Sequence, residues 1–154
     1  MLIVICLDLE DGLDPITGLV GRIALAGADV ELLHVVDTVE RVILERSLHA
    51  GVVRPQLADV EEELDDDERA MLRATYDQAA PVLGAQGIAN IRLSVGSGRP
   101  ERVIVSHLSE ANADLCVVAR RTDWKQRREV GPHSVGKVAR YIVDHASCPV
   151  FVLR

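Results

Sequence analysis

Short apolar runs recur along the chain at regular intervals. Uninterrupted runs at Leu2–Leu7 and Leu115–Ala119 have the length of strands that are buried on both faces, and Val150–Leu153 predicts a short final strand. Residues 30–36 form another apolar run, which ends at an aspartate. Residues 91–95 alternate apolar with polar side chains, as an edge strand with one face in water would. The pattern therefore predicts five strands.

Helical spacing fills the intervals between these runs. Asp14 and Pro15 suit the cap and first position of a helix, whose apolar residues follow at i, i+3, i+4 and i+7, and Gly27 can end it. Helices are also expected within residues 38–86, where Pro81 should kink or restart the last turn, and over 100–112 and 135–142. Strands that alternate with helices form βαβ units, so we predict an α/β fold with a parallel sheet.

Composition and charge narrow the classes of function. A chain of 154 residues suggests one domain over residues 1–154. It carries 17 basic and 24 acidic residues, a net charge of −7, which argues against nucleic acid as a partner. No apolar run approaches the ~18 residues of a membrane span. Cys6, Cys116 and Cys148 form no CxxC pair, which favours reduced thiols in the cytoplasm.

The carboxyl ends of the predicted strands carry the first candidate residues. In open parallel sheets ligands bind at this edge, where the strand order reverses. Asp8 follows the first strand, Val36 ends the second and Ala119 ends the fourth. Asp8 suits the hydroxyl or amino groups of a ligand, and helix capping or loop solvation is the alternative. We interpret His34 as a hydrogen-bonded core residue rather than a ligand-binding one.

A glycine-containing loop before the last helix is the sharpest local motif. Residues 131–137 read G-x4-G-K, in which glycine backbone and a helix N-terminus favour an anion. Val138 stands where a Walker loop has the hydroxyl that binds Mg²⁺, so we reject that class of NTPase. The alternatives left open are a phosphate-contacting loop without hydrolysis and a plain helix entry. The loop includes His133 and Ser134, and a basic stretch that includes Arg121 precedes it.

Several segments together resemble the universal stress protein family, over the whole chain and with the C-terminal segment as the most specific part. They are the first strand with Asp8, Glu31–Asp37, Gly98–Glu101, Ala113–Val118 and His145–Arg154. The resemblance implies a Rossmann-like three-layer α/β/α fold with sheet order 3-2-1-4-5. It also implies a homodimer, and either ATP binding or a role without nucleotide.

ATP-binding members of that family carry G-x2-G-x9-G-[ST] after the fourth strand. Ala119 and Thr122 replace the first two glycines here, Gly136 keeps the third after a longer spacer, and Lys137 replaces the hydroxyl residue. By the resemblance, Ala119 and Gly136 would flank the phosphates. Asp8 would contact the adenosine, and the backbone of Val36 would approach the adenine.

We therefore expect a stress-response or signalling module that binds ATP, AMP or another small anionic ligand without turnover and without a metal. The expected binding residues are Asp8, Val36, Ala119, Arg121, His133, Ser134, Gly136 and Lys137. A ligand-free homodimeric interaction module of the same family is the alternative, and a weak nucleotide hydrolase ranks third. The expected dimer forms through Val150–Leu153, because this apolar edge strand has no charge before Arg154.

Overall fold

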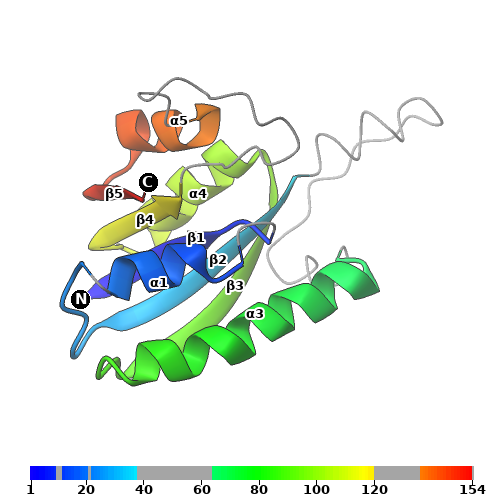
Figure 1. Cartoon of the computed structure of the whole chain (residues 1–154). Helices are drawn as coiled ribbons and strands as arrows, with labels where there is room; N and C mark the ends of the chain where they lie inside the picture. The colour runs from blue at the N-terminus through cyan, green and yellow to red at the C-terminus, as the bar shows by residue number, and fades with distance from the viewer. Residues whose placement is uncertain (10–11, 21, 38–63, 120–135, 154) are drawn as a thin grey trace.

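A five-stranded parallel sheet forms the centre of the structure (Figure 1), a computed structural model that describes all residues except 10–11, 21, 38–63, 120–135 and 154. The strand order is β3-β2-β1-β4-β5, as predicted. The elements are β1 Leu2–Leu7, α1 Asp14–Val20, β2 Asp29–Asp37, α3 Asp66–Gly84, β3 Asn90–Gly98, α4 Pro100–Glu110, β4 Leu115–Ala119, α5 Lys137–His145 and β5 Val150–Leu153.

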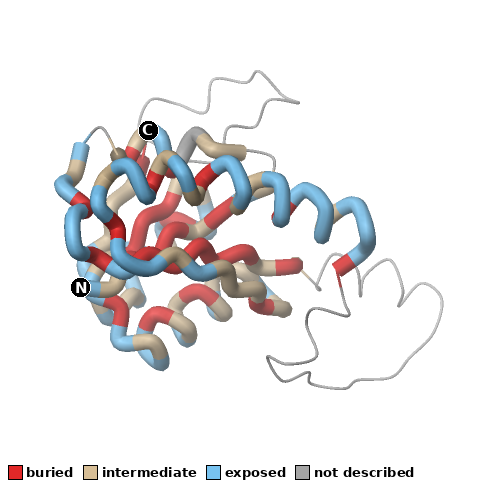
Figure 2. The backbone as a smooth tube through the Cα atoms, turned by 90° about the horizontal axis from the view of Figure 1, so that it is seen from below, coloured by how far each residue is buried: buried red, intermediate tan, exposed pale blue. Residues whose placement is uncertain are grey.

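Helices cover both faces of the sheet, so the fold has three layers (Figure 1). Helices α1 and α3 lie on one face, and α4 and α5 lie on the other. Two apolar clusters result because strand side chains alternate between the faces. Ile3 and Leu32 belong to the cluster beneath α1 and α3, whereas Val4 and Leu33 belong to the cluster beneath α4 and α5. Figure 2 shows the buried residues concentrated in the sheet layer, with exposed residues on the outer sides of the helices.

The predicted elements agree with the structure except at some ends. Helix α1 ends at Val20 and does not reach Gly27. Leu25 is nevertheless buried and Ile23 is half-buried. The apolar residues after Val20 are therefore buried in a loop and not in a helix. Helix α3 continues through Pro81 to Gly84, so the expected restart does not occur. The helical pattern expected over residues 38–63 lies outside the described residues.

The register brings the carboxyl ends of three strands to one edge. Leu7 of β1 pairs with His34 of β2, and Ile5 pairs with Val117 of β4. Asp8, which follows β1, therefore lies at the same edge as Ala119, the last residue of β4. This edge includes the switch point between β1 and β4, where the strand order reverses and where open α/β sheets bind ligands.

Candidate functional site

A cavity of about 540 Å³, here called the inner cavity, opens at this edge of the sheet. It lies where β1, β2 and β4 end and where α4 and α5 begin. Its volume is in the range of small-molecule sites in proteins. Apolar side chains from strands and helices line much of it, and these are Leu33, Val35, Ile104, Val118, Ala139 and Ile142. Such a lining suits a flat, weakly polar group such as a heterocyclic base.

Acidic groups line the inner cavity near the ends of β1 and β2. Asp8 is the first residue after β1, and Asp37 is the last of β2. Glu101 adds a carboxylate from the first turn of α4. Carboxylates accept hydrogen bonds from hydroxyl and amino groups, so this side of the cavity suits a sugar or the amino group of a base.

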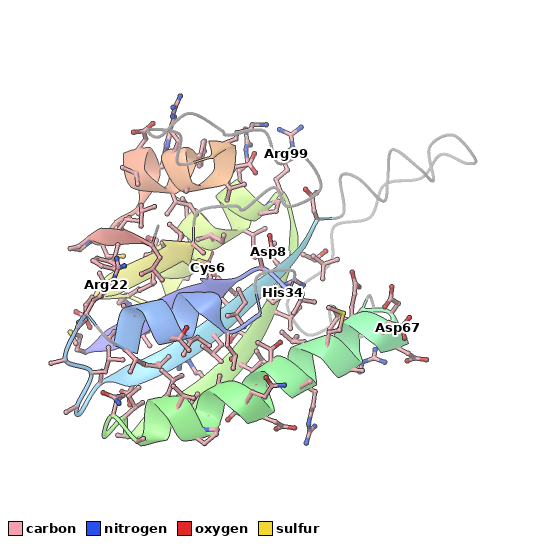
Figure 3. All side chains as sticks on the ribbon, viewed as in Figure 1. Cys6, Asp8, Arg22, His34, Asp67 and Arg99 are labelled. Carbon is pink, nitrogen blue, oxygen red and sulfur yellow. The ribbon has the colours of Figure 1, made fainter. Side chains whose placement is uncertain are left out.

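His34 adds a neutral imidazole to the same wall. The side chain of His34, labelled in Figure 3, belongs to β2. Its Nδ1 lies 3.3 Å from the carbonyl oxygen of Leu7, to which the ring N–H donates. Burial lowers the pKa of His34, which favours the neutral ring at neutral pH. With Nδ1 protonated, Nε2 is left as an acceptor. The expectation of a buried, hydrogen-bonded histidine agrees with this geometry, but its place in the cavity wall was not foreseen.

The start of α5 also lines the inner cavity. Gly136 precedes the helix with φ +80°, a backbone conformation that favours glycine. Gly136, the N-cap residue of α5, has no side chain to cap the first turn, and the exposed Lys137 opens the helix. Uncapped N–H groups beside a lysine are favourable partners for an anion. Val138 follows Lys137, so a hydroxyl is absent from the position that holds Mg²⁺ in a Walker loop.

The structure brings four of the expected binding residues together. Asp8, Ala119, Gly136 and Lys137 all line the inner cavity. The side chain of Val36 packs into the core under α1 and α3, while its neighbours Val35 and Asp37 line the cavity. Arg121, His133, Ser134 and the rest of the basic stretch lie outside the described residues.

Sequence reasoning missed Glu101 and Cys6 as lining residues. Glu101 belongs to the Gly98–Glu101 segment that carried the family resemblance, and its place in the first turn of a helix after β3 is the signal that could have found it. Cys6 looked like an inert residue of an apolar strand, yet it lines the inner cavity. Its Sγ lies 3.9 Å from Sγ of Cys116 on the adjacent β4. The hydrogen bond with Cys116, together with burial, raises the pKa of the Cys6 thiol well above its ordinary value.

A second polar cluster lies away from the cavity, between β2, β3 and α4. Glu31 is almost fully buried, and its carboxylate accepts hydrogen bonds from Arg92 Nη2 at 2.7 Å and His107 Nε2 at 2.8 Å. Ser94 Oγ donates a third. Burial alone would raise the pKa of Glu31, but the bonds from His107, Ser94 and Arg92 outweigh it and bring the pKa to about 2. This cluster joins three elements.

Within the described part of the chain, no group of three or more potential ligands is arranged to hold a metal ion. No helix described by the structure is long and apolar enough to cross a membrane.

Comparison of the sequence with models of known protein families identifies the family of this chain. The profile of the Universal stress protein family matches residues 2–154. The chain belongs to the universal stress protein family. No functionally curated protein matches its sequence significantly.

Solved universal stress proteins share this fold. A universal stress protein from Lactobacillus plantarum is 24% identical with a TM-score of 0.70, over 100% of this chain and 97% of that one. A protein of the family from Archaeoglobus fulgidus, in complex with dAMP, is 18% identical with a TM-score of 0.63, over 100% and 98% of the two chains. A family protein from Arabidopsis thaliana with AMP bound is 14% identical with a TM-score of 0.60, over 99% and 90%.

Proposed function

We propose that this universal stress protein binds an adenine nucleotide in the inner cavity without turning it over, and acts in stress response or signalling. The observation that carries the proposal is the placement of the cavity at the β1/β4 switch point. Asp8 lines it from the end of β1, and Gly136 and Lys137 line it from the start of α5. The apolar lining suits the base, Asp8 suits the ribose hydroxyls, and the start of α5 suits the phosphate. The AMP and dAMP complexes of distant family members support the same ligand class.

Hydrolysis is a weaker candidate for this site. Phosphoryl transfer depends on metal ions and cationic groups that neutralise the developing charge, and on a group that positions the attacking water. The described lining of the inner cavity has Lys137 but neither a metal cluster nor a hydroxyl at position 138. We therefore place the protein among nucleotide-binding modules rather than enzymes. Steady phosphate release from ATP and Mg²⁺, above that of Lys137→Ala, would contradict this placement.

Calorimetry with ATP, ADP and AMP tests the ligand. Asp8→Asn and Lys137→Ala should each weaken binding by about tenfold or more, since a lost charge-assisted hydrogen bond costs ~1.5–3 kcal/mol. Arg73→Ala is the matched control for lost positive charge, because Arg73 is exposed on α3, far from the cavity lining. Absence of binding by the wild-type protein at millimolar nucleotide would refute the proposal and favour the ligand-free interaction module.

We also propose a homodimer that pairs β5 with its copy. Strand β5 is an edge strand of the sheet. Among the described strands, it pairs with β4. Its sequence Val150–Leu153 has no charged residue, whereas the other edge strand, β3, presents the exposed Arg92. Soluble proteins cover or pair an uncharged edge of this kind. In a dimer with two-fold symmetry, the β5 strands of the two copies would pair with each other.

A further inference from the structure

A second cavity, here called the outer groove, lies next to the inner one. Its volume is about 400 Å³, and it is lined by the first turn of α4 and by α5. Its lining residues are Glu101, Gly136, Lys137, Arg140, Tyr141 and Asp144. Helices α4 and α5 pack beside one another on the same face of the sheet (Figure 1).

The two cavities share Glu101, Gly136 and Lys137. These residues therefore form the boundary at which a ligand bound in one cavity would enter the other. A nucleoside that fills the inner cavity would place its phosphates at Gly136 and Lys137. The part of the ligand beyond those phosphates would lie in the outer groove. The volume of the outer groove is by itself that of a small-molecule site.

Charged side chains of both signs line the outer groove. Lys137 and Arg140 are three residues apart on α5, so they lie on neighbouring turns of one helix side. Asp144 is one further turn along, and Glu101 faces the groove from α4. Among the residues that the structure describes, no hydrogen bond or ion pair engages the side chains of these four. Within this part of the chain, no side chain competes with a ligand for these four charges.

Tyr141 provides a firmly placed ring in the wall of the groove. Its ring stacks on that of His145 with centroids 4.0 Å apart and planes 9° from parallel. His145 Nδ1 also lies 2.9 Å from the carbonyl oxygen of Tyr141, which keeps the imidazole in that position. An aromatic ring held in this way can contact a base or sugar at little cost in side-chain entropy.

The order of these charges along the groove discriminates between ligands. The two cations suit a phosphate chain that runs past the start of α5. Beyond them, Asp144 presents a carboxylate, which accepts hydrogen bonds from the hydroxyl and amino groups that a nucleoside carries. The far end of the ligand should therefore be a second nucleoside rather than a terminal phosphate.

We propose that the inner cavity and the outer groove together bind a dinucleoside polyphosphate, with one nucleoside in each and the phosphate chain along Lys137 and Arg140. This inference rests on the proposed nucleotide binding in the inner cavity. It specifies the ligand class of that site, and the outer groove supplies the second subsite.

Titration calorimetry with diadenosine tetraphosphate, ATP and AMP tests the two subsites. The wild-type protein should bind diadenosine tetraphosphate about tenfold or more tightly than ATP. Arg140→Ala and Asp144→Ala should each weaken binding of the dinucleotide by about tenfold. They should change AMP binding by less than about twofold, because AMP reaches only the inner cavity. Arg102→Ala, an exposed charge on α4 outside both linings, is the matched control.

The outcomes separate this inference from the function on which it rests. ATP binding that equals or exceeds dinucleotide binding, with Arg140→Ala neutral, overturns the second subsite and leaves the nucleotide proposal standing. Failure of all three probes to bind overturns both. Circular dichroism of each variant identifies loss of folding, and Asp8→Asn should weaken all three ligands together.

Discussion

At the scale of single residues, Glu31 is the clearest example of a side chain whose role depends on distant partners. It is the most buried carboxylate in the described chain, and its partners Arg92, Ser94 and His107 come from β3 and α4. Burial of an unpaired charge would cost several kcal/mol, which these three hydrogen bonds offset. Glu31 therefore couples the edge strand to the helix above it.

Glu31→Gln should destabilise the protein at neutral pH and lose that effect in acid. The folded pKa of about 2 lies below the ordinary value of 4.5. The carboxylate therefore contributes about 3 kcal/mol above pH 4.5, and this is lost as pH falls from there through 2. Urea unfolding of both proteins at several pH values measures the difference.

The matched control for Glu31→Gln is Asp77→Asn, which removes an exposed carboxylate from α3. It should change the unfolding free energy by less than about 0.5 kcal/mol. A difference between wild type and Glu31→Gln that stays constant from pH 7 to pH 3 would contradict the role assigned to Glu31.

At the scale of secondary-structure elements, Gly96 controls how closely β3 and α4 approach. Gly96 is buried near the end of β3, and a Cβ built on it would lie 2.6 Å from Cγ1 of Val103 on α4. That distance is far inside van der Waals contact, so any larger residue must move Val103 or the helix. Because α4 carries Glu101, this contact also fixes one wall of the inner cavity.

Gly96→Ala should lower the unfolding free energy by about 1–3 kcal/mol. Gly84→Ala is the control, because a Cβ there meets nothing within 4 Å, and it should stabilise α3 by about 0.5–1 kcal/mol. Denaturant titration compares them. Adding Val103→Ala to Gly96→Ala should recover part of the loss, and absence of recovery would place the strain elsewhere.

The elements also show what a pattern of apolar residues can reveal. Leu2–Leu7, Leu115–Ala119 and Val150–Leu153 were predicted with the bounds that the structure has, because each is an uninterrupted apolar run between polar segments. The same reasoning made the predicted first helix too long, because the apolar residues after Val20 are buried without being helical. The Glu31 cluster had no local signal, because its partners lie 61–76 residues away in sequence.

At the scale of the whole molecule, the β5 edge determines the proposed assembly. Cys116 pairs with Val150 and donates its N–H to the carbonyl of Pro149 at 2.9 Å. In a parallel ladder, this pattern directs the N–H and C=O groups of Val150 and Val152 away from β4. These groups form the edge that a second copy would pair with.

Val152→Pro should convert the proposed dimer to a monomer, because proline removes an N–H on the side away from β4. Val152→Ala keeps that N–H while trimming the side chain, so it should remain dimeric. Sedimentation velocity at high micromolar concentration distinguishes them. A monomeric wild-type protein, or a Val152→Pro variant that remains dimeric, would refute the pairing.

The candidate site could be predicted in outline because its position follows from topology. Once the sheet order is known, the carboxyl ends of β1 and β4 place Asp8 and Ala119 at one edge, and the start of the last helix adds Gly136 and Lys137 to the same cavity. The outer groove could not be predicted in this way. It depends on how α4 and α5 pack, and the spacing of Arg140, Tyr141 and Asp144 along one helix does not reveal a neighbour.

The thiol of Cys6 is a natural chemical probe of the inner cavity. Its raised pKa keeps it protonated at neutral pH, so alkylation by iodoacetamide should be slow. A nucleotide in the cavity would cover the sulfur and slow the reaction further, since Cys6 belongs to the lining. The rate of Cys6 alkylation, followed by mass spectrometry, thus measures occupancy of the inner cavity in the protein without any mutation.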